Sequence, residues 1–314
     1  MSTPLVLEHP DGVCARTVAV TGGVLAALEA KPASGQTLRG LVVLLPGFTG
    51  SKEDFTGVLP TLAALGWWAV AVDQRGQYES TGPNDVDSYR LLDFSADACD
   101  AITMLRGEVG KQDVAVHLVG HSFGGLVARE TALQCWSGGD PKGLQSLTLL
   151  CSGPGPLPAA SHAALAELVA ALPATKLELI WTIVRTRSNE ALNGDPTTDF
   201  LRRRFLANNP WALKSMAAIL RETPDRTEEL AAIVAASREN RRVLVAYGET
   251  DDAWPLEWQD DMARRLGTTG VPIPDAGHSP AAETHQSAAA TVALLDAFWS
   301  GSPPIRPLHG ADAV

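Results

Sequence analysis

The sequence predicts an α/β fold in which a mostly parallel sheet is flanked by helices. Three observations predict it: short apolar segments recur along the chain, helical patterns lie between them, and one long interval without a strand pattern interrupts the series. Strands that are apolar on both faces are typical of a parallel sheet covered by helices, and alternation with helices gives right-handed crossovers. A chain of 314 residues can form one such unit.

The expected strands are apolar runs that end at turn-forming or polar residues. The run 41–45 stops at Pro46-Gly47, and the run 114–119 stops at Gly120. Proline and glycine are the strongest local signals that an element ends. The complete set of expected strands is 41–45, 68–72, 114–119, 147–151, 243–247 and a short last strand, 271–274.

Helical patterns separate these strands, as the crossovers of a parallel sheet require. Apolar residues recur there at the spacing of one helix face, and the segments are long enough to return the chain to the start of the sheet. The expected helices are 56–65, 88–106, 124–135, 257–266 and 281–299.

The interval 154–240 lacks a strand pattern. It opens with a run rich in glycine and proline and continues with five amphipathic helical stretches, 163–172, 176–187, 198–207, 210–221 and 226–237. We therefore predict a helical cap, or lid, at 154–240, inserted into a core domain formed by 1–153 and 241–300. The remaining residues, 301–314, contain three prolines and are expected to form a C-terminal tail.

The composition excludes several classes of partner. With 25 basic and 36 acidic residues, the net charge is −11, and such a chain repels phosphate backbones, so nucleic acid is not expected. The arginines at 202–204 are interpreted as a solvated helix face. Since no segment approaches the roughly 18 consecutive apolar residues of a bilayer-spanning helix, no membrane span is expected.

Cysteine usage and the N-terminal sequence point to a cytoplasmic protein. The four cysteines form no CxxC pair and are too few for a disulfide framework. The first residues lack the basic and apolar regions of a signal peptide. Scarce lysine beside abundant alanine and arginine indicates a bacterial source. The sequence makes no prediction of the oligomeric state.

One motif carries the chemistry. Gly120-His121-Ser122-Phe123-Gly124 is a G-x-S-x-G sequence that directly follows an expected buried strand and opens an expected helix. A nucleophile elbow needs that context, because a tight, strained strand-to-helix turn lifts the serine hydroxyl out of the sheet. The helix N-terminus then offers free N–H groups to an oxyanion. The alternative interpretation is a glycine-rich turn with an incidental serine.

With this motif in its context, the chain resembles the α/β-hydrolase superfamily, in its capped, esterase-like and lipase-like branch. The resemblance extends from about residue 16 to residue 300. It implies a catalytic histidine between the last strand and the final helix, where the chain has His278. We interpret His121 as an elbow side chain and His117 as a histidine of the core.

The resemblance also implies a catalytic acid after the strand 243–247. The family pattern there is G-x-x-D with a proline four residues later, which Gly248, Asp251 and Pro255 satisfy. Ser122, Asp251 and His278 then stand in the order nucleophile, acid, base. The adjacent Asp252 stays open as an alternative acid.

The oxyanion hole implied by the resemblance consists of two backbone N–H groups. One belongs to Phe123, which follows the nucleophile, and the other to Phe48, in the loop after the strand 41–45. Family members often have histidine where this loop has Pro46, but the donor is backbone. A further loop resembles the family pattern D-x-R-G-x-G-x-S with Tyr78 replacing a glycine, and implies structural roles for Asp73 and Arg75.

These residues predict a serine hydrolase that needs no cofactor and no metal. It would cleave a carboxylic ester, thioester or lactone with an apolar acyl or aromatic part through an acyl-enzyme on Ser122. C–C bond hydrolysis, cyclase or thioesterase chemistry, and cofactor-free perhydrolysis remain alternatives in this fold, as does a ligand receptor that keeps the triad. The small-molecule pocket is expected among apolar cap residues, although packing could also use them: Trp181, Phe205, Trp211, Met216 and Leu220.

Overall fold

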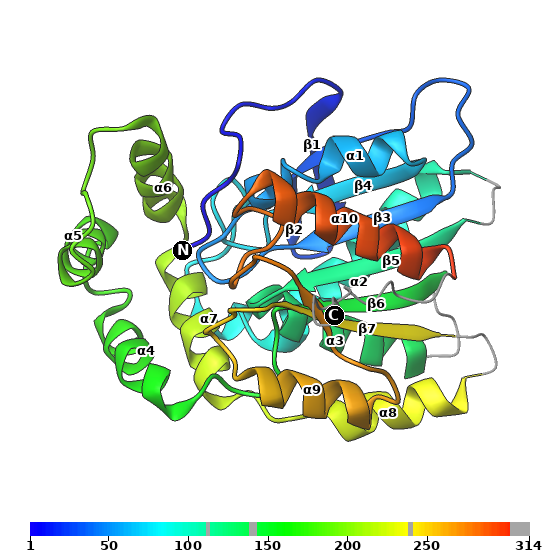
Figure 1. The fold of residues 1–314 in the computed structure, drawn as a ribbon. Helices are drawn as coiled ribbons and strands as arrows, with labels where there is room; N and C mark the ends of the chain where they lie inside the picture. Colours follow the sequence, from blue (N-terminus) through cyan, green and yellow to red (C-terminus); the bar gives the residue numbers. More distant parts are fainter. Residues whose placement is uncertain (111–113, 138–142, 238–240, 302–314) are drawn as a thin grey trace, which may run out of the picture.

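The computed structural model describes residues 1–110, 114–137, 143–237 and 241–301. Within these residues, eight strands form one sheet in the order β1-β2-β4-β3-β5-β6-β7-β8 (Figure 1). Strands β3 to β8 run parallel to one another, while β1 and β2 add an antiparallel hairpin. The bounds are β1 (Val13–Val20), β2 (Gly23–Ala30), β3 (Gly40–Leu45), β4 (Trp67–Val72), β5 (Ala115–His121), β6 (Leu144–Leu150), β7 (Arg242–Gly248) and β8 (Val271–Ile273).

This sheet confirms the predicted fold class. Every residue of β3 and of β4 is buried, as the apolar runs required. The hairpin of β1 and β2 was not predicted. In β1 only Val13 and Val18 are buried, and Arg16 and Thr17 interrupt its apolar residues, so this edge strand lacks the long apolar run of a buried strand.

Helices cover both faces of the sheet. Helix α1 (Leu59–Ala64) packs with α10 (His285–Trp299), and α2 (Leu91–Glu108) packs with α3 (Phe123–Ser137). Figure 1 shows the first pair in front of the strands and the second pair behind them. Helix α9 (Leu256–Arg265) packs on β7. The expected helix 56–65 is shorter than predicted, since α1 spans Leu59–Ala64, and a 3₁₀ turn, η1 (Lys52–Phe55), precedes it.

Helices α4 to α7 form the lobe at the left of Figure 1, which we call the insertion. They are α4 (Ala159–Ala171), α5 (Leu177–Arg187), α6 (Pro196–Ala207) and α7 (Pro210–Glu222). The next helix, α8 (Thr227–Ala236), packs instead on α3 and α9, beside the sheet. The division into core 1–153 and 241–300 and cap 154–240 stays a prediction, and the tail from residue 302 lies outside the described residues.

Two clusters of buried apolar side chains organise the molecule. The larger fills the space between the sheet and its helices, which together we call the body. The smaller lies in the insertion and consists of Leu172, Leu177, Ile180, Trp181, Phe200, Leu201, Phe205 and Leu213. Helix α7 joins the two clusters, since Met216 belongs to the larger and Leu213 to the smaller.

The arginine run on α6 corrects one expectation. Arg203 is exposed, but Arg204 is completely buried, and its guanidinium contacts the Asp54 carboxylate of the body at 2.7 Å. Successive helix residues point in directions about 100° apart, so neighbours in one run can face water and protein. The run is therefore only partly a solvated face.

Candidate active site

Ser122 occupies the turn between β5 and α3. Its backbone has a φ of +54°, a conformation that residues other than glycine rarely adopt. The Ser122 N–H donates to the Leu150 carbonyl at 2.9 Å, and the Ser122 carbonyl accepts from Gly125 N–H at 2.8 Å. The turn is thus strained and held on both sides, as a nucleophile elbow requires.

The two glycines of the motif are needed for space. A Cβ atom on Gly120 would lie 2.2 Å from the Gly124 carbonyl oxygen, and one on Gly124 would lie 2.4 Å from the Leu45 carbonyl oxygen. Both distances are far below van der Waals contact, and both partners are backbone. Close approach of backbone to backbone therefore explains the glycines at these positions.

The side chains of Ser122, His278 and Asp251 form one chain of hydrogen bonds. His278 Nε2 lies 2.9 Å from Ser122 Oγ, and His278 Nδ1 lies 2.8 Å from Asp251 Oδ1. Ser122 follows β5, Asp251 follows β7 and His278 follows β8, so one end of the sheet brings the three together. Asp252 is exposed and lines the neighbouring cavity.

Asp251 is fixed as a buried carboxylate. Its two oxygens also accept hydrogen bonds from Ala253 N–H at 3.0 Å and from the Gln259 amide at 2.9 Å. Burial raises the pKa of Asp251, but the hydrogen bond from His278, its charge and these two donors lower it by more, so the pKa lies below its usual value. Asp251 is therefore ionised at neutral pH and can hold the His278 ring in one orientation.

The predicted oxyanion donors lie on either side of the serine. Phe123 is the first residue of α3, where a helix has free N–H groups. The loop with Phe48 passes beside Ser122, since a Cβ atom on Gly47 would lie 3.0 Å from Ser122 Cβ. Within the described residues, neither the Phe48 nor the Phe123 N–H donates a hydrogen bond to another group.

Two glutamines that sequence reasoning missed hold this loop. Gln74 donates its side-chain amide to the Pro46 carbonyl at 2.9 Å, and Gln77 donates to the Gly47 carbonyl at 2.9 Å. Both carbonyls of the loop are thereby hydrogen-bonded. The expected structural residues of the same segment form ion pairs, Asp73 with Lys52 at 2.8 Å and Arg75 with Asp97 at 2.7 Å. Nothing in the spacing of the two glutamines identified them.

His121 supports the loop that carries His278. Its Nε2 contacts the His278 carbonyl oxygen at 2.6 Å. Burial, with the nearby His278 ring, lowers the pKa of His121 to about 4, so it is neutral at neutral pH. The other histidine of β5, His117, is a core residue: it contacts Ser146 Oγ at 2.7 Å, and burial lowers its pKa to about 3.

His121, Cys151 and His278 lie close enough together to be considered as metal ligands. Both ring nitrogens of His278 already contact Ser122 and Asp251, and the His121 Nε2 contacts a carbonyl oxygen. Burial raises the pKa of the Cys151 thiol well above its usual value. A metal ion held by these three residues would therefore have to displace the His278 hydrogen bonds and bind Cys151 as a thiolate.

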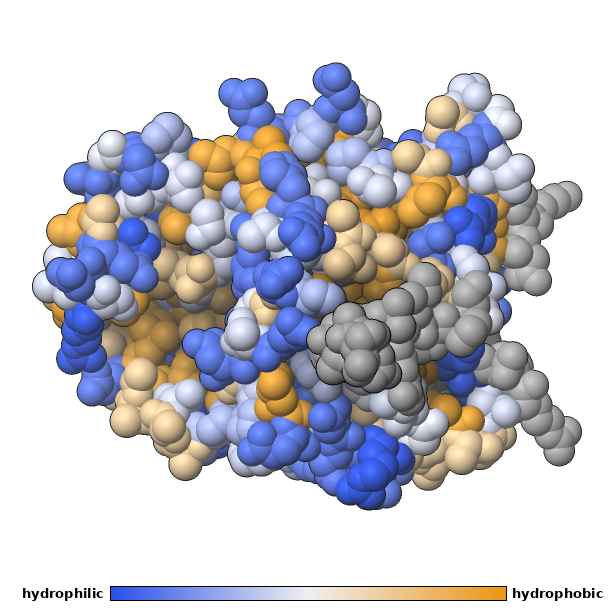
Figure 2. Space-filling model, viewed as in Figure 1, coloured by the Kyte–Doolittle hydropathy of each residue, from blue (hydrophilic) through white to orange (hydrophobic). Residues whose placement is uncertain are grey.

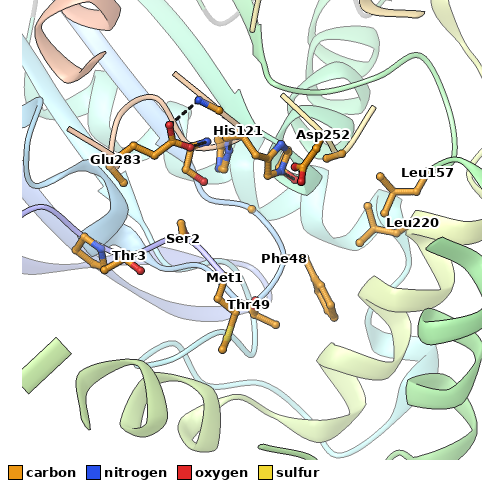
Figure 3. A pocket seen from close by; sticks show the side chains of 18 of the residues that line it. Met1, Ser2, Thr3, Phe48, Thr49, His121, Leu157, Leu220, Asp252 and Glu283 are labelled. Carbon is orange, nitrogen blue, oxygen red and sulfur yellow. Dashed lines mark hydrogen bonds between the residues drawn. The ribbon is translucent and has the colours of Figure 1, made fainter. Parts of the chain in front are cut away.

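A cavity of about 830 Å³ opens in front of Ser122 and His278, within the size range of ligand pockets. Figure 2 shows a hollow with hydrophobic side chains between the insertion and the body. Three leucines of the interval after β6, Leu157, Leu165 and Leu220, line the cavity, and so do two acids, Asp252 and Glu283. The first five residues of the chain contribute a further part of the wall (Figure 3).

The structure corrects the expected pocket residues. In the described chain, Leu220 lines the cavity, but Trp181, Phe205, Trp211 and Met216 do not. Trp181 and Phe205 pack against each other, with ring centroids 5.8 Å apart, inside the insertion. Met216 is buried in the body, and Trp211 packs on its core. Packing between helices thus uses the large apolar side chains.

Comparisons with known proteins agree with this architecture. Residues 42–293 match the model of the Alpha/beta hydrolase family. The chain belongs to the α/β-hydrolase family. In the described part, no helix combines the length and the apolar character needed to cross a bilayer.

Individual α/β hydrolases are similar over different spans. AB hydrolase superfamily protein YfhM of Bacillus subtilis (strain 168) is 31% identical over 118 residues, a match that covers 38% of either chain. A thermophilic esterase from Thermogutta terrifontis has a TM-score of 0.65 at 20% identity, over 92% of this chain and 98% of its own. A carboxylesterase from Bacillus subtilis has a TM-score of 0.65 at 17% identity, over 94% of each chain.

Proposed function

We propose that this α/β hydrolase is a serine hydrolase that cleaves carboxylic esters, thioesters or lactones through an acyl-enzyme on Ser122. The observation that carries the proposal is the chain of hydrogen bonds from Ser122 through His278 to Asp251, at 2.9 and 2.8 Å. A serine is a weak nucleophile until an oriented base can take its proton, and this geometry supplies both base and orienter.

The reaction follows from the geometry. Ser122 Oγ attacks the substrate carbonyl carbon while His278 Nε2 accepts the hydroxyl proton. The negative charge on the carbonyl oxygen is held by the N–H groups of Phe48 and Phe123, each contributing about 3 kcal/mol to the transition state. His278 then gives the proton to the leaving alcohol or thiol, and Asp251 stabilises the imidazolium between these steps. In the second half, water attacks the acyl carbon while His278 takes its proton. The bond from that carbon to Ser122 Oγ then breaks, the carboxylic acid is released, and His278 returns the proton to Ser122 Oγ.

The cavity wall favours uncharged substrates. Leucine side chains line part of it, and its charged side chains in the described chain, Asp252 and Glu283, are acidic. Both Glu283 oxygens accept backbone N–H groups, from Gly277 at 2.6 Å and Ser279 at 2.7 Å. A carboxylate or phosphate on the substrate would meet these acids, and burial lowers the pKa of the Met1 amino group in the same wall, which disfavours its positive charge. We therefore infer a neutral substrate with an apolar acyl or aromatic part.

The test is the intact mass of the protein after treatment with a small fluorophosphonate, with Ser122→Ala as the matched variant. One adduct on the wild type and none on the variant is the expected result. An adduct on both variants, or on neither, contradicts an activated Ser122. Hydrolysis of p-nitrophenyl butyrate by the same two proteins then measures turnover.

The other chemistries of this fold would use the same serine. Product analysis separates ester hydrolysis from C–C bond cleavage, cyclisation and perhydrolysis, and labelling without turnover of any acyl substrate would favour a ligand receptor. The proposal needs no cofactor. A cytoplasmic location and the absence of a nucleic-acid partner stay predictions of the composition.

A further inference from the structure

We propose that the N-terminal segment Met1–Leu5 determines how large a substrate the cavity accepts, and that Arg204 of the insertion holds this segment in place. The inference rests on the proposed function, because it concerns the cavity beside Ser122. It assigns a specificity-determining role to residues that lie outside the helices and strands, in a segment to which the sequence motifs gave no role.

The segment forms a wall of its own. All five residues line the cavity, more than any other continuous stretch contributes in the described chain. Figure 3 shows Met1, Ser2 and Thr3 at one side and Leu157 and Leu220 at the other. Phe48, whose N–H group is a proposed oxyanion donor, lies between the two sides. A bound substrate therefore extends from Ser122 toward leucines on one side and toward the N-terminal segment on the other.

A buried ion pair fixes the beginning of the segment. Arg204 donates to Asp54 Oδ1 at 2.7 Å and to the Ser2 carbonyl oxygen at 2.6 Å, and Ser2 Oγ donates to Asp54 Oδ2 at 2.5 Å. The side chains of Arg204 and Asp54 are 0% and 3% exposed. Removing one partner of a buried ion pair leaves the other charge buried without a counter-charge, which costs free energy. Arg204, Asp54 and Ser2 therefore hold one another in a single arrangement.

A second set of contacts fixes the end of the segment. Thr56 Oγ1 lies 3.1 Å from the Val6 carbonyl oxygen and 2.9 Å from the Glu53 carbonyl oxygen, so its hydroxyl is shared between the two. Leu5 lies against Gly57 so closely that a Cβ atom there would be 2.7 Å from Leu5 Cδ1. The residues between Ser2 and Val6 are thus held at both ends against the body. They form a fixed wall rather than a free arm across the cavity opening.

The same carboxylate also reaches the proposed oxyanion loop. Asp54 Oδ2 accepts the Ser51 N–H at 3.3 Å, and a Cβ atom on Gly50 would lie 2.5 Å from that oxygen. Asp54 therefore joins three parts of the molecule: the loop with Phe48, helix α6 through Arg204, and the N-terminal segment through Ser2. Loss of the segment changes the cavity wall, whereas loss of Arg204 also loosens the insertion.

The experiment compares the wild type with a variant that lacks residues 1–5. Two series of esters are used: p-nitrophenyl acetate, butyrate and octanoate, which vary the acyl part, and ethyl, butyl and octyl acetate, which vary the alcohol. In the series that extends toward the segment, kcat/KM for the longest ester relative to the shortest is expected to rise about tenfold in the truncated protein. That is the effect of burying roughly two more methylene groups.

Point variants make the test independent of the deletion. Thr3→Trp should narrow the cavity and lower the same ratio about tenfold. Arg204→Met should raise the ratio, and Arg203→Met, on the same helix but exposed, is the matched control and should leave it unchanged. If the truncated protein does not fold, the kcat/KM ratios of Thr3→Trp and Arg204→Met still test the role of the segment.

Fluorophosphonate labelling separates the two proposals. If the variants are labelled on Ser122 as fully as the wild type, and the ratio stays constant in both ester series, the role of the segment is overturned while the serine hydrolase stands. If the wild type is neither labelled nor active, the proposed function fails first.

Discussion

The end of the sheet and the helical insertion use their side chains in different ways. At the sheet, Ser122, Asp251 and His278 each follow a strand, so the backbone of a turn places the side chain. In the insertion, Trp181 and Phe205 lie on helices, where rotation and packing decide which way each points. The comparison teaches that position along the chain predicts function at strand ends but not on helices.

The largest expected effect tests the strand-end half of this comparison. Replacing Ser122 with alanine should lower kcat by about a millionfold, because members of such a triad act as a unit. Steady-state hydrolysis of p-nitrophenyl butyrate measures it. Turnover above about a thousandth of the wild-type value would mean that another residue is the nucleophile.

The next prediction separates two adjacent carboxylates. Asp251→Asn should lower kcat about 10⁴-fold, because the amide cannot hold His278 in the required tautomer. Asp252→Asn is the matched control and should change kcat less than about tenfold, since Asp252 is exposed and lines the cavity wall. A larger loss for Asp252→Asn would show that the wrong acid has been assigned.

The third prediction concerns the insertion. Trp181→Ala should lower the free energy of unfolding by about 3–5 kcal/mol, the cost of removing a buried aromatic side chain. The ratio of kcat/KM between octanoate and acetate should stay within about twofold in the folded variant, because Trp181 is 1% exposed and does not line the cavity. Urea unfolding and ester kinetics measure the two effects. If the kcat/KM ratio changed while the free energy of unfolding did not, Trp181 would contact the substrate after all.

The smallest effect lies within the sheet. His117 and His121 have pKa values of about 3 and about 4, held down by burial, whereas an unfolded histidine has about 6.5. Below pH ~6.5 these histidines are protonated in the unfolded chain but stay neutral in the native protein. The free energy of unfolding therefore falls as the pH decreases toward about 4. Each histidine contributes up to about 1.4 kcal/mol per pH unit in this window.

Substituting His117 isolates one of the two contributions. His117→Phe keeps a ring beside Trp299, on which His117 stacks with centroids 5.1 Å apart. Urea unfolding between pH ~4.5 and ~6.5 should show a slope smaller by that of one histidine, while stability at pH ~8 serves as the reference. An unchanged slope would mean that His117 takes up its proton in the native state.

The sequence predicted the parallel strands and the placement of Ser122, because an apolar run and a glycine-bounded turn are local properties of the chain. The choice between Asp251 and Asp252 rested on the resemblance, and the hydrogen bond to His278 is made by Asp251. The wall formed by Met1–Leu5 could not be predicted, since it depends on Arg204, about two hundred positions away. The periodicity of apolar residues predicts local helices and strands, but it does not predict a contact between residues about two hundred positions apart.

The strained turn at Ser122 has a consequence for how this scaffold can change. Its shape depends on Gly120 and Gly124, whose missing side chains make room for backbone at 2.2 and 2.4 Å. Those glycines contribute no side chain to the proposed chemistry, which uses the Ser122 hydroxyl. The shape of the turn therefore depends on Gly120 and Gly124, whereas the proposed reactivity depends on Ser122. A substitution at position 122 would exchange the proposed nucleophile, whereas a methyl group on either glycine would force the backbone of the turn to shift.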